Sequence, residues 1–228
     1  MRKYSASLEM TPGEKLWAGC YYLVMFCALP MLLQWLSGAL LHLNDAQENF
    51  LYYFINFLAV MWILSHYIEK AIETVKHSPF LFLQSIILGV VAYYACFGAI
   101  TWGIGKLFPW FHNANDTAMT AMAGTDFFLT AIGVCILVPV TEELLFRGLL
   151  FGSLYKKKPA AAYLVSALAF GLIHILGYRM SIAASALSLL QYLPAGLWLA
   201  WSCTKSGSIL SAITIHALIN GAALYFAR

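Results

Sequence analysis

The chain of 228 residues is 62% hydrophobic and only 10% charged, with a formal net charge of +3. Because soluble domains are about 25% charged, this composition excludes an ordinary soluble protein and indicates a helical protein that lies almost wholly in a lipid bilayer. We expect no nucleic-acid partner, since basic residues do not gather with aromatic side chains. The five cysteines contain no CxxC pair, so neither a disulfide framework nor a thiolate metal site is predicted.

Apolar runs of membrane-spanning length recur along the chain and predict an all-α, polytopic transmembrane helix bundle with about seven spans. The expected spans are residues 17–41, 50–68, 80–105, 127–154, 159–176, 181–203 and 207–226. The first run is too long for the core of a signal peptide, so we expect it to be retained. Residues 69–77 are mixed in polarity and suit the membrane interface, and residues 106–126 form the longest expected loop.

The distribution of lysine and arginine predicts a cytoplasmic N-terminus. With that orientation, nine basic residues lie in cytoplasmic segments and three in the opposite segments, as the positive-inside rule requires. The nine are Arg2, Lys3, Lys15, Lys70, Lys76, Lys156, Lys157, Lys158 and Lys205, and the three are Lys106, Arg179 and Arg228. The remaining basic residue, Arg147, lies inside the fourth expected span.

The fourth span carries three formal charges in the motif Glu142-Glu143-x-x-x-Arg147. Each charge costs roughly 2.5–3.5 kcal/mol in the middle of a membrane helix, so such residues usually belong to a site that faces the bundle interior. Glu143 and Arg147 are four residues apart and can pair on one helical face. Glu142 is turned about 100° away, which leaves one carboxylate free to act as a general base. The alternative is a buried ion network that only holds helices together.

Two further motifs with polar residues lie on other spans. The fifth contains Phe170 and His174, and the seventh contains His216 and Asn220, which are four apart and share a face. With a helix rise of about 1.5 Å per residue, the polar groups of these spans and Glu142 lie roughly 14–22 Å from the cytoplasmic ends, near the middle of a ~30 Å core. A lone histidine would indicate only a hydrogen-bonded core residue, but convergence at one depth predicts a joint site.

The motifs Glu-Glu-x-x-x-Arg, Phe-x-x-x-His and His-x-x-x-Asn, in this order on separate spans, make residues 127–226 similar to the CAAX protease and bacteriocin-processing (Abi) family. Its members are intramembrane glutamic endopeptidases, and the type II CAAX prenyl endopeptidase is the eukaryotic relative. The resemblance divides the chain into an N-terminal region of three spans without a motif, residues 1–126, and a catalytic core of four spans, residues 127–228.

The resemblance implies hydrolysis of a peptide bond in a membrane-associated or lipidated peptide, without a cofactor. The apolar composition indicates an integral multi-pass protein, and the short loops and small size favour a prokaryotic cell membrane. It implies that Glu142 is the general base that activates a water, and that His174 holds and polarises this water. His216 and Asn220 would stabilise the oxyanion. Structural support would come from Glu143, Arg147 and Phe170.

Two alternatives remain open. Glu142, His174 and His216 could bind zinc as in a metalloprotease, although no His-Glu-x-x-His motif is present and the two histidines lie on different spans. Buried glutamate and histidine also form proton relays, so the second alternative is a proton-coupled transporter or a non-catalytic immunity or scaffold protein. Transporters often have two related halves, whereas the polar residues here concentrate in the C-terminal half of the chain.

Overall fold

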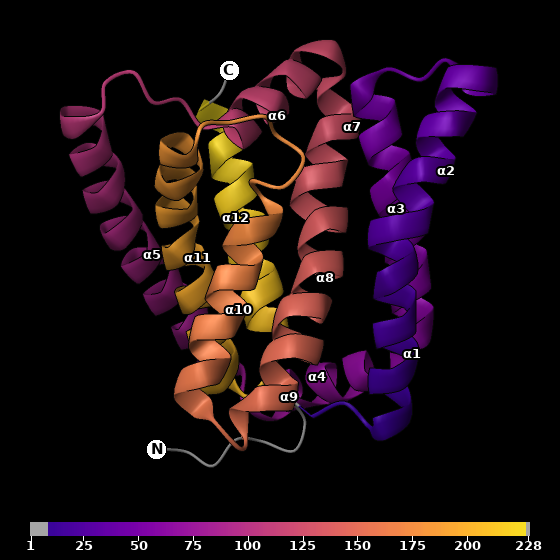
Figure 1. The fold of residues 1–228 in the computed structure, drawn as a ribbon. Coiled ribbons are helices and arrows are strands. Elements are labelled where there is room, and N and C mark those ends of the chain that lie inside the picture. The colour runs from indigo at the N-terminus through magenta and orange to yellow at the C-terminus, as the bar shows by residue number, and fades with distance from the viewer. Residues whose placement is uncertain (1–8, 227–228) are drawn as a thin grey trace.

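The computed structural model describes residues 9–226, and all regular structure in this part of the chain is helical (Figure 1). The predicted all-α class is therefore confirmed for these residues. The helices are α1 (Pro12–Leu23), α2 (Leu29–Leu36), α3 (Asp45–Ile63), α4 (Ser65–His77), α5 (Pro79–Leu107), α6 (Ala114–Thr125), α7 (Phe127–Ile132), α8 (Val138–Glu143), α9 (Gly152–Tyr155), α10 (Pro159–Ile173), α11 (Ile182–Ser206) and α12 (Leu210–Phe226). Short π-helical segments join α1 to α2, α7 to α8, and α8 to α9.

Four continuous helices in the described residues are long and apolar enough to cross a membrane. They are Pro12–Leu41, Pro79–Leu107, Phe127–Tyr155 and Ile182–Ser206. The pair α3 and α4 makes a fifth candidate, but α4 is bent by 79° relative to α3. α10 and α12 are apolar but shorter, with 15 and 17 residues. The fold is therefore that of an integral membrane helix bundle, and the expected count of seven spans stays a prediction.

The segment expected as the longest loop contains a helix. Asn113 caps α6 by accepting hydrogen bonds at its side-chain oxygen from the backbone N–H groups of Asn115 and Asp116. The sequence did not reveal this helix because alanine, threonine and methionine alternate along it without a clear apolar face. α6 lies across one end of the bundle, opposite to the end where α4 and α9 lie (Figure 1).

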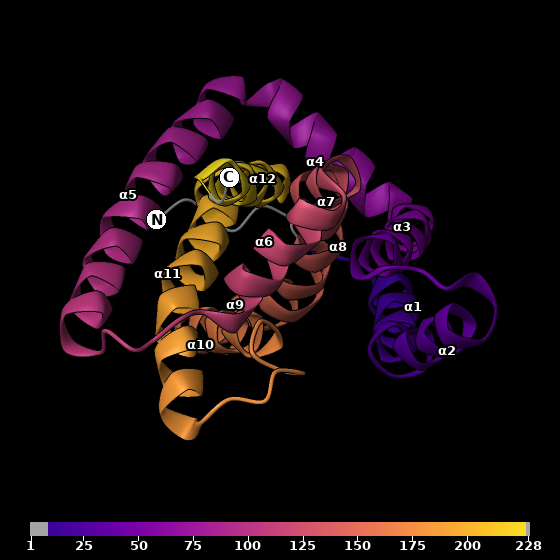
Figure 2. The same ribbon diagram turned by 90° about the horizontal axis from the view of Figure 1, so that it is seen from above.

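The long helix that contains α8 occupies a central place in the bundle. One of its sides packs against α12, and another packs against α3. Viewed from above, α5 and α11 flank α12, whereas α1, α2 and α3 stand together on the far side of α8 (Figure 2). A polar side chain on α8 can therefore meet groups from both the N-terminal and the C-terminal parts of the chain.

A glycine allows α10 and α11 to come unusually close. A Cβ atom on Gly196 would lie 2.5 Å from the Cα atom of Ala167, a distance that only glycine avoids. Small residues permit such close approach between membrane helices. The carbonyl groups of Ala195 and Gly196 lie within hydrogen-bond distance of Arg147, in the π-helical segment that follows α8.

Candidate active site

A proline shapes the helix that carries the two glutamates. In the π-helical turn Gly133–Leu137, the N–H of Val138 donates to the carbonyl of Gly133, five residues earlier. The following residue is Pro139, which has no N–H to offer. The carbonyl of Val134 instead accepts a hydrogen bond of 2.7 Å from Asn220 Nδ2 on α12. The irregular turn thus fixes Asn220 beside α8, as π-helical bulges often do near functional sites.

Glu143 is the acceptor at the centre of a buried charged cluster. Its Oε1 atom lies 3.0 Å from Arg147 Nη1 and 2.8 Å from His216 Nδ1. Glu143 is fully buried and Arg147 is only 2% exposed. Because an ionised carboxylate only accepts hydrogen bonds, Nδ1 is the protonated nitrogen of His216. The Glu143 carboxylate therefore connects α8 to α12, because it accepts hydrogen bonds from both Arg147 and His216.

Arg147 is held by further groups from α10 and α11. Its Nη2 atom donates to the carbonyls of Ala195 and Gly196 at 3.4 and 3.3 Å. Its guanidinium carbon lies 4.4 Å from the ring centroid of Phe170, a distance typical of a cation–π contact. Phe170 also meets the ring of His216 edge to face, with 5.5 Å between the centroids. One arginine thus links four helices.

The neighbouring carboxylate, Glu142, has a different environment. It is 3% exposed, and its Oε1 atom accepts a hydrogen bond of 2.9 Å from the hydroxyl of Tyr53. Its Oε2 atom has no hydrogen-bond partner in the described part of the chain. This oxygen lies 3.9 Å from His174 Nε2. Glu142 therefore keeps one free oxygen next to an imidazole.

His174 has a defined tautomer. Its Nδ1 atom lies 2.8 Å from the carbonyl of Phe170, which can only accept, so Nδ1 carries the proton. In the neutral ring, Nε2 then has a lone pair that faces Glu142. Two acceptors 3.9 Å apart do not bond to each other, but a water molecule between them can donate one hydrogen to each.

Glu142, His174 and Asn220 line a cavity of about 130 Å³, which we call the inner cavity. Asn49 and Tyr53 from α3 and Met122 from α6 also line it. The structure thus brings three of the four expected catalytic residues to one space. His216 does not line the inner cavity and lies behind it, against Glu143 and Phe170.

Residues of α11 and of the start of α6 cover the ring of His174. The ring of Tyr192 packs on the ring of His174 with 4.4 Å between the centroids. The Tyr192 hydroxyl lies 3.2 Å from Asn113 Oδ1 and 3.3 Å from Asp116 Oδ1, so these two acceptors share its one hydrogen. These contacts hold the start of α6 and the ring of Tyr192 against His174.

Sequence reasoning missed Tyr53, which comes from the N-terminal region that carries no motif. Tyr53 lies in the middle of α3, whereas tyrosines of membrane helices concentrate at the two interfaces. A buried tyrosine hydroxyl normally needs a hydrogen-bond partner, so its position is a signal that the sequence does contain. Tyr22 on α1 similarly donates to the carbonyl of Thr141, next to Glu142.

No group of three or more histidine, cysteine, aspartate or glutamate side chains within residues 9–226 is arranged to hold a metal ion. The three residues considered as zinc ligands are divided between two places, because His216 contacts Glu143 whereas His174 faces Glu142.

The fold and the site define an all-α membrane protein with a buried glutamate, histidine and asparagine around one cavity. Residues 124–222 match the family model for the Rce1-like type II CAAX prenyl endopeptidases, and they form a domain of this family of CAAX-type intramembrane proteases. The motif residues from Glu142 to Asn220 all lie within the matched range.

A bacterial protein is also similar to the chain. The UPF0177 protein YxdF of Lactococcus lactis subsp. lactis is 33% identical over 107 residues, which cover 46% of this chain and 55% of that protein. The chain thus matches about half the length of this relative. No solved structure gives a significant match.

The buried cluster predicts a large effect of removing its arginine. We expect Arg147→Ala to reduce the free energy of unfolding by roughly 3–5 kcal/mol, because Glu143 would keep a buried charge without its counter-charge. Thermal unfolding of the purified protein in detergent measures the change. Adding Glu143→Gln should restore part of the loss.

Lys76→Ala is the matched control for Arg147→Ala. Lys76 lies 2.7 Å from Glu73, but both side chains are exposed, so this substitution should hardly alter the melting temperature. An Arg147→Ala protein that melts like the parent contradicts the proposed importance of the cluster.

Proposed function

We propose that this protein is an intramembrane endopeptidase that hydrolyses a peptide bond of a membrane-associated or lipidated peptide with a water activated by Glu142. The observation that carries this proposal is the buried Oε2 atom of Glu142, which has no partner in the described residues and faces His174 Nε2 at 3.9 Å across the inner cavity. A water bound between these two acceptors lies next to a base.

The first step uses the two groups that hold the water. Glu142 takes a proton from the water while the water oxygen forms a bond to the carbonyl carbon of the substrate. His174 orients the water through its Nε2 lone pair. The tetrahedral intermediate then collapses, the C–N bond breaks, and the proton on Glu142 passes to the leaving nitrogen.

Asn220 is the donor placed to stabilise the oxyanion. One hydrogen of its amide group is used by the Val134 carbonyl at 2.7 Å, and the other is available at the inner cavity. Preorganised donors of this kind are worth about 2.7–4 kcal/mol in acyl transfer. His216 lies behind the cavity wall, so its proposed contribution is to hold Glu143 and Phe170 in position. Direct donation from His216 to the oxyanion would require its ring to be protonated at Nε2.

We also propose seven spans with a cytoplasmic N-terminus in a prokaryotic cell membrane. α10 and α12 complete the count, since their 15 and 17 residues extend about 23–26 Å, close to the ~30 Å of a bilayer core. The lysines beside α9 support this orientation, and the bacterial relative supports the prokaryotic membrane.

The topology predicts opposite accessibility for two loop positions. Arg179→Cys should react with a membrane-impermeant maleimide added to intact cells, whereas Lys157→Cys should react only after the membrane is opened. Mass spectrometry of the labelled peptide distinguishes each introduced cysteine from the five native ones. Labelling of Lys157→Cys in intact cells, with protection of Arg179→Cys, would reverse the proposed orientation.

The mechanism predicts that Glu142→Gln abolishes cleavage without unfolding the protein, because the amide keeps the size of the side chain but is not a base. Comparison of membrane peptides from cells with the parent and the variant identifies the products, and their rate of formation should fall at least ~100-fold. Glu69→Gln, at an exposed carboxylate of α4, should leave the rate unchanged. An active Glu142→Gln protein rules out Glu142 as the base.

Tyr53 is predicted to position the base. Tyr53→Phe removes the hydrogen bond to Glu142 Oε1, and hydrogen bonds to charged groups contribute about 1.5–3 kcal/mol. We expect kcat to fall about tenfold or more with little change in KM. Tyr21→Phe is the matched control, since it removes a 2.7 Å hydrogen bond to Asn56 that does not involve the site. Equal kcat values for the two variants contradict the positioning role.

A further inference from the structure

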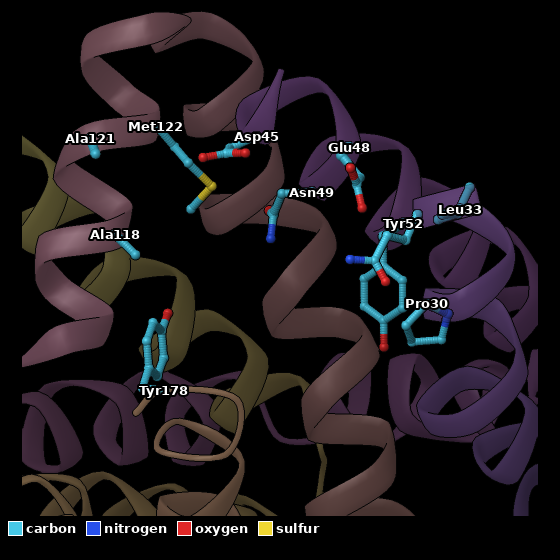
Figure 3. A pocket seen from close by; sticks show the side chains of 11 residues that line it. Pro30, Leu33, Asp45, Glu48, Asn49, Tyr52, Ala118, Ala121, Met122 and Tyr178 are labelled. Atoms are coloured by element: carbon cyan, nitrogen blue, oxygen red, sulfur yellow. The ribbon is translucent and has the colours of Figure 1, made fainter. Parts of the chain in front are cut away.

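A second and larger cavity lies beside the inner cavity. It has a volume of about 650 Å³, within the range of ligand pockets. α2, α3 and α6 line it, together with Tyr178 from the segment between α10 and α11 (Figure 3). We call it the outer cavity. Because Ala118, Ala121 and Met122 of α6 line it, the outer cavity lies toward the end of the bundle that carries α6.

The outer and inner cavities adjoin each other. Asn49 and Met122 line both of them, so they form the boundary between the two spaces. On the inner side of this boundary lies the unpartnered, buried Oε2 atom of Glu142. A chain that reaches this oxygen from the outer cavity has to pass Asn49 and Met122.

The charge of the outer cavity has one sign. Among the described residues that line it, Asp45 and Glu48 are the only charged ones. Neither forms an ion pair with a described lysine, arginine or histidine. Both belong to the first turn of α3, where the helix dipole favours a negative charge. Figure 3 shows the carboxylate of Asp45 directed toward Met122.

Stabilisation of the helix terminus does not by itself account for this placement. The N-terminus of α3 already has a capping box, in which Asn44 and Gln47 each accept a hydrogen bond from the other's backbone N–H. The two additional carboxylates line the cavity without a counter-charge. Two such charges favour the binding of a cationic group, because a cleft lined by one sign of charge concentrates the opposite sign.

We propose that the outer cavity binds the substrate peptide on one side of the cleaved bond and selects a segment that carries a lysine or arginine side chain. This inference rests on the proposed peptidase function and adds a substrate class to it. The segment enters past α6, places its cationic side chain next to Asp45 and Glu48, and continues past Asn49 to the inner cavity.

The position of the cationic residue follows from the length of α3. Asp45 and Glu48 precede Tyr53, the partner of Glu142, by eight and five residues, or roughly 8–12 Å along a helix. An extended peptide covers about 3.3 Å per residue. The selected lysine or arginine therefore lies about two to four residues from the cleaved bond.

The charge preference can be measured without a substrate. In the Ala121→Cys protein, the new thiol lines the outer cavity, and its modification by a trimethylammonium-ethyl methanethiosulfonate and by the anionic sulfonatoethyl reagent is followed by mass spectrometry. We expect the cationic reagent to react about tenfold faster. Neutralisation by Asp45→Asn with Glu48→Gln should remove most of this preference.

Thr117→Cys supplies the control, since Thr117 is exposed on the same helix but does not line the cavity. Its rate ratio should not respond to the neutralised pair. If the double variant does not fold, the ratio of the two reagent rates is measured in the Ala121→Cys protein at low and at high salt. Higher salt should reduce a preference that exposed charges create. Equal rates for the two reagents, or a preference unaffected by both neutralisation and salt, overturn the proposal.

The peptides cleaved in cells provide the second measurement. Peptides that depend on Glu142 should carry lysine or arginine two to four residues from the cleaved bond, on one side of it, and the neutralised pair should reduce this enrichment. Cleavage that depends on Glu142 but shows no such enrichment overturns the cationic selection alone. If no peptide depends on Glu142, the peptidase function fails, and the reagent rates still decide whether the cavity prefers cations.

Discussion

The buried cluster of Glu143, Arg147 and His216 is the interaction on which the site depends. A carboxylate without exposure to solvent is stable only when a counter-charge and donors surround it, and here they come from its own helix and from α12. Arg147 in turn needs the carbonyls of α11 and the ring of Phe170. The four helices that form the site are therefore fixed by one charge that takes no direct part in the proposed chemistry.

Two adjacent glutamates acquire different roles because a helix turns by about 100° per residue. Glu143 points into the cluster and has its charge compensated. Glu142 points toward the inner cavity, where Tyr53 holds one oxygen and leaves the other free. The pairing of Glu143 with Arg147 fixes the backbone of α8. Glu142 therefore keeps its position without a cationic partner.

Much of this arrangement could be predicted from the sequence, because charges in apolar spans are few and helical spacing decides which of them share a face. The pairing of Glu143 with Arg147 and the proximity of Glu142 to His174 belong to this class. The placement of His216 could not be predicted, since the spacing within its own span does not show whether it contacts Glu142 or Glu143. Tyr53 was missed because aromatic residues are common in membrane helices, and α6 because its composition has no period. The π-helical turn depends on Pro139 and on a donor from α12 that is 86 residues away.

The family domain begins at residue 124, yet the site is not complete without the preceding helices. The chemical groups of the motifs come from residues 142–220, but α3 supplies the hydrogen bond to Glu142 and the boundary between the two cavities. Residues that perform hydrolysis have to meet one fixed geometry, whereas residues that bind a substrate have to match only that substrate. Under the proposed function, the C-terminal part carries the chemistry and the N-terminal part positions the base and the peptide, which accounts for motifs in the first part and not in the second.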